Sequence, residues 1–180
     1  FAGGYHGLSL GALRVMGYSK HFQKPFLELL EPSVTVVPLA ARMPAETTET
    51  EAEQNLREEQ QITIFRRTLS SASSAFGAVL LEPVIGRGGV LPWSRRFLNE
   101  VITLTHQHGA LVIFDEIWTG FGRCGEMLFS HGLDVDLLCV GKALGGGFPI
   151  SACVGKDSIM AAWSEHTVGE ALHTATFFGH

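Results

Sequence analysis

The sequence predicts an α/β fold, a mostly parallel sheet flanked by helices. Short apolar runs rich in strand formers end abruptly in charged residues, proline or glycine, a pattern typical of strands buried on both faces. Segments with helical spacing separate several of these runs, and strands that alternate with helices are typical of βαβ units with right-handed crossovers. A chain of 180 residues is long enough to form one domain with a sizeable core.

Each predicted strand is a compact run of β-branched or aliphatic residues with a polar, proline or glycine boundary. Pro38, Glu82-Pro83, Asp115 and Gly141 close four of the runs. The expected strands are residues 34–37, 76–81, 111–114, 137–140 and 150–154.

The clearest helix is expected over residues 93–108, where apolar residues recur at four-residue steps and Gly109 stops the pattern. Residues 47–69 are rich in glutamate and predict a peripheral helix with a break, whose charges form a solvated face. Shorter helical pieces are expected within 8–30, near 126–131, and after a cap at Asp157 or Ser158 with Ile159, Met160 and Trp163 inward.

Composition excludes several functional classes. The net charge of −5 gives no basic field for nucleic acid, and no apolar run is long enough to span a membrane. Three widely spaced cysteines, Cys124, Cys139 and Cys153, predict reduced thiols and a cytoplasmic protein. The histidines do not follow a metal-ligand spacing.

A carboxylate and an amine follow two predicted strands. Asp115 ends the run at 111–114, and Lys142 follows the run at 137–140. Ligands of open α/β sheets bind beyond the carboxyl ends of the strands, so both groups are expected beside a ligand. This pair suits a cofactor that has a cationic ring nitrogen and an aldehyde. An ordinary salt bridge at the strand ends would explain the two residues equally well.

The main rival from another class is an ATPase, because the run that ends in Asp115-Glu116 resembles a Walker B strand. That function needs a phosphate loop of the form G-x-x-x-x-G-K-[ST], normally upstream. Gly141-Lys142 and Gly155-Lys156 lie downstream and are followed by alanine and aspartate. The sequence therefore argues against an ATPase.

The glycine-rich start of the chain carries Tyr5 and His6. Glycines allow backbone to approach a ligand closely, and Tyr5 could stack on a flat ring. A tyrosine packed on the surface is the simpler alternative.

Taken together, the motifs resemble the class III aminotransferases, the ω-amino branch of the fold type I pyridoxal phosphate enzymes. The similarity extends over essentially the whole chain, in the order of the family. Its motifs are Tyr5-His6-Gly7; Glu82-Pro83-Val84 with Gly86 and Gly88-Gly89; Phe114-Asp115-Glu116-Ile117 with Thr119-Gly120-Phe121-Gly122-Arg123; Gly141-Lys142-Ala143-Leu144 with Gly145-Gly146-Gly147; and His173 with Thr176-Phe177 and Gly179.

The resemblance implies a cofactor, pyridoxal 5'-phosphate, and a role for each site residue. Lys142 would form the Schiff base and shuttle a proton, and Asp115 would pair with the pyridine nitrogen. Tyr5 and Ile117 would cover the two ring faces. Thr176 would bind the phosphate of the partner subunit's cofactor, which implies a homodimer. The reaction would be ping-pong transfer of an amino group from an amino acid or amine to a 2-oxo acid.

Four positions depart from the family pattern, and at one of them Ile85 replaces a glutamine. Arg87 replaces a glutamate and is expected either to contact a substrate carboxylate or to face solvent. Trp118 stands where many relatives carry a glutamine against the 3' oxygen of the cofactor, and an indole has only one donor. His180 stands where asparagine is usual.

The resemblance also implies that residues 1–180 are part of the cofactor-binding large domain. The upstream phosphate loop and the C-terminal small domain would lie outside the sequence. An aminomutase, a decarboxylase and an inert dimerising relative remain alternatives, because the substrate residues that would distinguish them also lie outside it.

Overall fold

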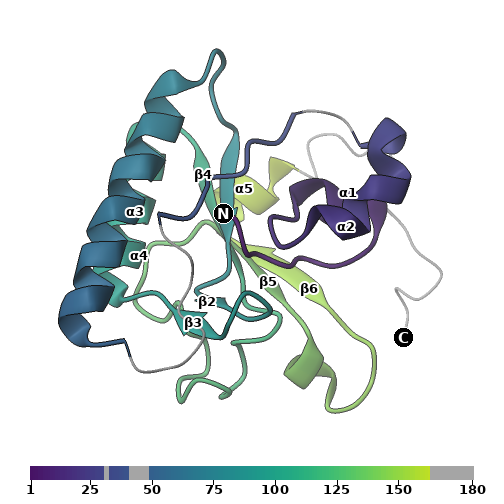
Figure 1. Ribbon diagram of the computed structural model, residues 1–180. Coiled ribbons are helices and arrows are strands. Elements are labelled where there is room, and N and C mark those ends of the chain that lie inside the picture. Colours follow the sequence, from purple (N-terminus) through teal and green to yellow (C-terminus); the bar gives the residue numbers. More distant parts are fainter. Residues whose placement is uncertain (31–32, 41–48, 163–180) are drawn as a thin grey trace.

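The computed structural model describes residues 1–30, 33–40 and 49–162 (Figure 1). The helices are α1 (Leu10–Val15), α2 (Lys20–Gln23), α3 (Glu51–Ser71), α4 (Arg95–Gln107) and α5 (Asp157–Met160), with 3-10 turns η1 (Lys24–Leu29) and η2 (Lys142–Gly145). The strands are β1 (Ala78–Leu81), β2 (Val84–Ile85), β3 (Leu91–Pro92), β4 (Leu111–Asp115), β5 (Leu137–Val140) and β6 (Ala152–Gly155).

The main sheet has the order β1-β4-β5-β6. The pairs β1–β4 and β4–β5 are parallel, and β6 runs antiparallel to β5. The connection from Gly141 to Ser151 is short, whereas a parallel crossover takes about a dozen residues or more, so β6 returns antiparallel. The predicted mostly parallel sheet with flanking helices is confirmed.

Helices α3 and α4 lie together on one side of the sheet, and α1 and α2 lie on the other side of the molecule (Figure 1). Ser94 caps α4 by accepting the amide of Phe97, and the apolar stripe of α4 packs onto β4. Val112 and Phe114 of β4 are fully buried under it. Each such side chain contributes about 1.5–3 kcal/mol when buried, so α4 fixes the position of β4.

Helix α3 is continuous, and the expected break is absent. Thr50 and Glu53 form a capping box that starts the helix well before its apolar residues begin. Ile62, Phe65 and Leu69 then face the core over the last turns. A strong start and a buried end hold the middle of the helix together despite its polar sequence.

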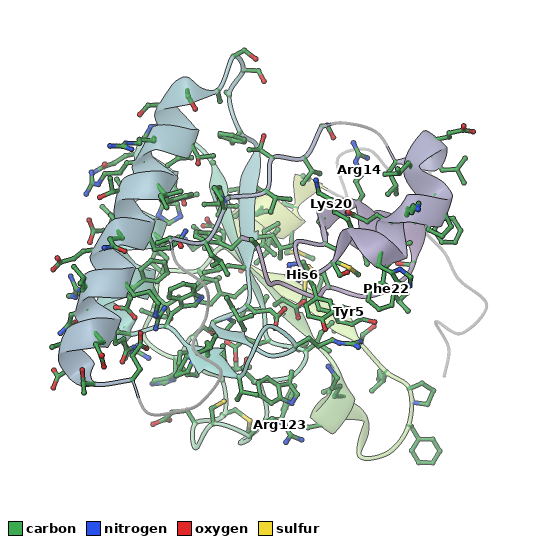
Figure 2. The ribbon with its side chains drawn as sticks, viewed as in Figure 1. Tyr5, His6, Arg14, Lys20, Phe22 and Arg123 are labelled. Atoms are coloured by element: carbon green, nitrogen blue, oxygen red, sulfur yellow. The ribbon has the colours of Figure 1, made fainter. Side chains whose placement is uncertain are left out.

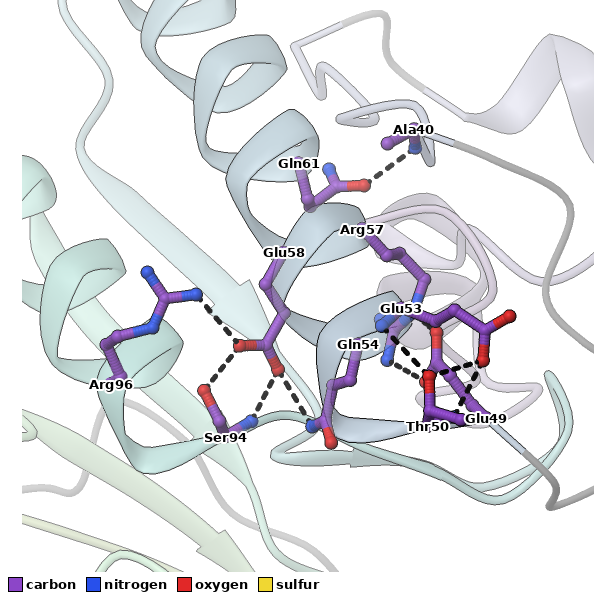
Figure 3. A network of polar contacts seen from close by, with 10 residues as sticks. All are labelled: Ala40, Glu49, Thr50, Glu53, Gln54, Arg57, Glu58, Gln61, Ser94 and Arg96. Carbon is purple, nitrogen blue, oxygen red and sulfur yellow. Dashed lines mark hydrogen bonds and ion pairs between the residues drawn. The ribbon is translucent and has the colours of Figure 1, made fainter.

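The expectation that the charges of α3 form only a solvated face is also wrong. Glu58 is fully buried, and Arg57 and Gln61 are nearly so. Glu58 accepts the amide of Ser94 at 2.7 Å and contacts the Ser94 hydroxyl, which joins α3 to the start of α4 (Figure 3). A carboxylate that accepts amide donors in this way can be buried without an unsatisfied charge.

Two predicted strand or loop assignments differ from the structure. Residues 34–37 are extended but pair with no strand in the described chain; the Val37 carbonyl accepts the amide of Ala2 instead. Residues 84–92, expected as a loop, contain the antiparallel pair β2–β3. Whether a segment forms a strand depends on the segments beside it as well as on its own residues. The local sequence pattern does not show which segments lie beside one another.

Two small helical predictions also differ. Residues 126–131 form turns, because the Glu116 carboxylate takes the amides of Phe129 and Ser130 that a helix would use. Lys156, and neither Asp157 nor Ser158, occupies the N-cap position of α5, and its side chain makes no capping hydrogen bond. Ile159 and Met160 are half-buried, whereas Trp163 lies outside the described residues. None of the described helices combines the length and the apolar character needed to cross a membrane.

Candidate functional site

A cavity of about 530 Å³ lies at the carboxyl ends of the parallel strands. The side chains that carry its chemistry come from the end of β4, from the segments that follow β1, β4 and β5, and from the start of the chain. They are Tyr5, Arg87, Asp115, Ile117, Trp118 and Lys142. The volume is typical of pockets for small molecules and cofactors, which are about 300–1,000 Å³.

A larger cavity of about 750 Å³ lies at the opposite end of β1, beside residues 72–78. Arg67 is its one charged lining residue among those described, and serines and threonines form much of the wall. Ligands of parallel sheets bind at the carboxyl ends of the strands, and the groups predicted to be chemically active line the smaller cavity. We therefore take the smaller cavity as the candidate site.

Asp115 is the last residue of β4, and its side chain is 8% exposed. One carboxylate oxygen lies 2.7 Å from His6 Nδ1, and the other accepts the amide of Ile117 at 3.1 Å. An ionised carboxylate only accepts hydrogen bonds, so His6 donates from Nδ1. Each oxygen keeps a further lone pair, and Asp115 can accept one more donor from a ligand.

The sequence predicts no role for His6, although the residue stands within the Tyr5-His6-Gly7 motif. Its side chain is only 5% exposed and binds a residue 109 positions away. Its position next to Tyr5 is the one feature of the sequence that could have placed His6 in the site. The contact with Asp115 could not be predicted, because contacts between residues so far apart in the sequence depend on the tertiary fold.

Glu82 follows β1 directly and is buried. Its two oxygens accept the amide of Tyr5 at 2.5 Å and the amide of Gly86 at 2.8 Å. Burial raises the pKa of the Glu82 carboxyl above its ordinary value, although these two amides act in the opposite direction. Glu82 thus ties the first loop of the chain to the turn that begins at Gly86.

Tyr5 lies among other aromatic rings at the edge of the cavity (Figure 2). The rings of Tyr18 and Phe22 approach it edge-on at centroid distances of 6.0 Å and 6.3 Å. The guanidinium of Arg87 lies 4.4 Å from the centroid of the Tyr5 ring. Such packing fixes the orientation of the Tyr5 ring before a ligand arrives.

Lys142 begins η2 with a left-handed backbone, at a φ of 40°. For a residue with a Cβ atom, this conformation is roughly 1–2 kcal/mol less favourable than the right-handed one. Its side chain is exposed and lines the cavity together with Asp115. Unusual backbone conformations of this kind concentrate at functional sites, where the surrounding structure maintains them.

Trp118 forms a wall of the cavity close to Gly86. A Cβ atom at Gly86 would lie 3.3 Å from both the Trp118 ring and a Glu82 oxygen. A side chain at position 86 would therefore push the indole into the cavity or break the Glu82 hydrogen bond. The structure places Trp118 in the wall of the candidate site.

Glu116, next to Asp115, is fully buried and structural. It accepts the amides of Phe129 and Ser130 and the hydroxyl of Thr119. Glu116 thus holds the loop after β4 in place.

The remaining predicted groups lie away from the cavity. His106 binds Asp136 at 2.7 Å, and His108 binds the Leu104 carbonyl at 2.8 Å, so both make structural contacts. The three cysteines are free. Thr176, His173 and His180 fall outside the described residues.

Comparison with known proteins agrees with this fold. The family model "Aminotransferase class-III" matches residues 1–180. An (S)-enantioselective ω-transaminase from Thermomicrobium roseum is 23% identical with a TM-score of 0.77, over 99% of this chain and 40% of that one. A transaminase from the marine bacterium Virgibacillus is 26% identical with a TM-score of 0.74, over 99% and 38%.

An ornithine aminotransferase from Toxoplasma gondii is similar over 98% of this chain and 35% of its own, with 23% identity and a TM-score of 0.73. The chain thus spans 35% to 40% of the length of these three proteins. The match of the family model over every residue shows that the chain belongs to the class III aminotransferase family.

Proposed function

We propose that the full-length protein is a pyridoxal 5'-phosphate-dependent aminotransferase. It would move an amino group from an amino acid or amine to a 2-oxo acid. The observation that carries this proposal is the placement of Asp115, Lys142 and Tyr5 around one cavity at the ends of parallel strands. Family membership and the mention of PLP at the active site of the T. gondii relative support the cofactor.

The residues present fit the chemical groups of this cofactor. The buried carboxylate of Asp115 suits the ring nitrogen, Tyr5 and Ile117 offer surfaces for a planar ring, and the amine of Lys142 suits the aldehyde. Thr176, by the family resemblance, would hold the phosphate. When bound, the cofactor supplies an aldehyde that condenses with amines and a ring that accepts the electron pair of a carbanion.

Lys142 is proposed to hold the cofactor covalently and then to move a proton with its freed amine. The short turn η2 places this amine beyond the end of β5, in the cavity that Asp115 also lines. An amine acts as a base only when it is unprotonated, and exclusion of water by cofactor and substrate favours that form.

Asp115 is proposed to keep the ring nitrogen protonated, with His6 as a positioning residue. The 2.7 Å contact from His6 and the amide of Ile117 fix both carboxylate oxygens. A fixed carboxylate reaches its ligand without losing side-chain freedom on binding.

The first test uses the full-length protein with pyridoxal phosphate, a panel of amino donors, and pyruvate or 2-oxoglutarate. Lys142→Ala is expected to lower kcat by about 10⁴-fold or more, because the reacting group is removed. Asp115→Asn is expected to lower kcat/KM by about 10–100-fold, the value of one charge-assisted hydrogen bond.

Lys20→Ala is the control, since Lys20 is an exposed lysine of α2 away from the cavity lining. It is expected to retain wild-type activity. A wild-type protein that binds the cofactor but transfers no amino group to any acceptor would contradict the proposal and favour an aminomutase or a decarboxylase. A protein that binds no cofactor would favour an inert relative.

We also propose that the protein is a homodimer with shared active sites. The support is the family resemblance of the segment around Thr176, which would reach the cofactor of the partner subunit. Light scattering on the full-length protein tests this, and a monomer at working concentration would contradict it.

A further inference from the structure

Arg87 is a cation in the candidate site. From the sequence, its side chain was expected either to contact a substrate carboxylate or to face solvent. It lies in the tight turn between β2 and β3 and lines the cavity together with Asp115 and Lys142. Within the described residues, its guanidinium forms neither a hydrogen bond nor an ion pair with any carboxylate. Its N–H donors are therefore available to a ligand.

Three aromatic rings hold the guanidinium in place. Its central carbon lies 4.4 Å from the centroid of Tyr5, 5.2 Å from that of Tyr18 and 5.8 Å from that of Phe22. Attraction to ring faces restrains the guanidinium without using its N–H groups as donors to a protein oxygen. A guanidinium restrained in this way can bind an anion through two parallel hydrogen bonds.

The backbone of the turn is also fixed. Glu82 accepts the amide of Gly86 on one side of Arg87. On the other side, a Cβ atom at Gly88 would lie 2.5 Å from the Ile85 side chain, so only glycine fits this close contact. Arg87 thus projects from a turn held at both ends.

The carboxylates that share the cavity are already engaged. Asp115 is bound by His6 and by the amide of Ile117, and Glu82 accepts two amides. Burial raises the pKa of the Glu82 carboxyl, which weakens its tendency to act as a counter-ion. Among the described residues, neither of these carboxylates pairs with Arg87, so the guanidinium can take an anion brought by a ligand.

We propose that Arg87 binds the carboxylate of the substrate and makes the enzyme prefer amino acids over simple amines. This inference rests on the proposed aminotransferase function and names the class of substrate. The guanidinium shares its cavity with the two groups proposed to act on the cofactor, and it has five donors and no acceptor. The phosphate of the cofactor is also an anion that accepts hydrogen bonds from a guanidinium. The test therefore distinguishes binding of a substrate carboxylate from binding of this phosphate.

The kinetic arm compares full-length wild type with Arg87→Gln on matched donors in which a methyl replaces the carboxylate. The pairs are alanine with isopropylamine, and 3-aminobutanoate with 2-aminobutane. Arg87→Gln is expected to lower kcat/KM by about 10–100-fold for the carboxylate donors and by less than about threefold for the amines. Arg87→Lys keeps the charge but loses the planar fork and is expected to be intermediate.

A binding arm does not depend on turnover. Calorimetry measures 3-phenylpropanoate and its neutral amide, 3-phenylpropanamide, against both proteins. Arg87→Gln is expected to weaken binding of the carboxylate by about tenfold and to leave that of the amide unchanged. The dissociation constant of pyridoxal phosphate is expected to stay within about threefold, since Thr176 is proposed to hold its phosphate.

Arg123→Gln is the matched control. Arg123 also lies near an aromatic wall residue, 5.9 Å from the centroid of Trp118, but it does not line the cavity (Figure 2). It is expected to behave as wild type in all arms.

Equal losses of Arg87→Gln on acids and amines would overturn the inference while leaving the aminotransferase in place. A tenfold higher dissociation constant of pyridoxal phosphate for Arg87→Gln would also overturn the inference, because it would show that Arg87 binds the phosphate of the cofactor. A wild-type protein that transaminates no donor would contradict the proposed function, and the calorimetric pair would then decide the carboxylate site by itself.

Discussion

Single residues of the site adopt states that reduce stability. Lys142 has a left-handed backbone, and the buried carboxyl of Glu82 has a raised pKa. Each state has a visible structural cause, namely the turn after β5 for Lys142 and burial of the carboxyl for Glu82. Proteins keep such features where function outweighs their cost in stability.

Because the backbone at Lys142 is left-handed, we expect glycine to be more stabilising than alanine at this position, the reverse of the usual order. In full-length protein without cofactor, Lys142→Gly is expected to be more stable to urea than Lys142→Ala by about 1 kcal/mol, because glycine adopts a positive φ without a steric cost. The same two substitutions at Gln60, an exposed position in α3, should show the opposite order by about 1 kcal/mol. Glycine being the less stable choice at both positions would show that Lys142 is unstrained.

Part of the candidate site was predictable because its residues lie next to strand ends. Asp115 and Lys142 follow apolar runs whose boundaries are visible in the sequence, and both line the cavity. His6 was not predicted as a partner of Asp115, because the contact spans 109 positions. The contact of the Arg87 guanidinium with the Tyr5 ring likewise depends on the fold of two distant loops.

Among the elements, one carboxylate joins the far end of the sheet to its surroundings. Asp136, just before β5, accepts the amide of Val112 in β4, Nε2 of His106 in α4, and Nζ of Lys156 at the end of β6, each at 2.7 Å. Burial alone would raise the pKa of Asp136, but the bonds from Lys156, Val112 and His106 together hold it below its ordinary value.

The lowered pKa of Asp136 fixes the pH range of its contribution to stability. The charged form is favoured in the folded state, so the contribution is fully present above the ordinary value near pH 4 and is lost as pH falls through the lowered pKa. Asp136→Asn is expected to reduce the free energy of unfolding by about 1–3 kcal/mol at pH 7, with a smaller difference at pH 3.

Urea denaturation of the full-length protein at several pH values measures this difference. Asp134→Asn is the control, since Asp134 also binds Lys156 at 2.7 Å but its side chain is 69% exposed. Its effect should stay within about 0.5 kcal/mol. A loss for Asp136→Asn that is the same at pH 7 and pH 3 would show that its charge is not responsible.

The predictable elements are those whose signals are local. Helix α4 has an apolar stripe, a serine cap and a glycine stop, and β4 and β5 are apolar runs with sharp ends. Residues 34–37 have the same kind of run but lack a partner strand in the described chain. The turns at 126–131 replace a helix because the buried carboxylate of Glu116 takes two of their amides.

In the whole molecule, the strand order creates the site. Because β4 lies between β1 and β5 and all three are parallel, the residues that follow them meet at one edge of the sheet. The sequence predicted the βαβ connections, but it placed Tyr5 beside Asp115 only through the family resemblance. The structure brings both residues to one cavity.

The central claim is that Lys142 faces the ring-binding acid Asp115 across this cavity and holds the cofactor aldehyde. Borohydride reduction of the full-length protein with bound pyridoxal phosphate, followed by peptide mass spectrometry, tests it most directly. We expect one pyridoxyl label in the wild-type protein, on Lys142. We expect no label in Lys142→Ala at a pyridoxal phosphate concentration that saturates the wild-type protein. A label on Lys20, Lys24 or Lys156 with Lys142 unmodified would contradict it.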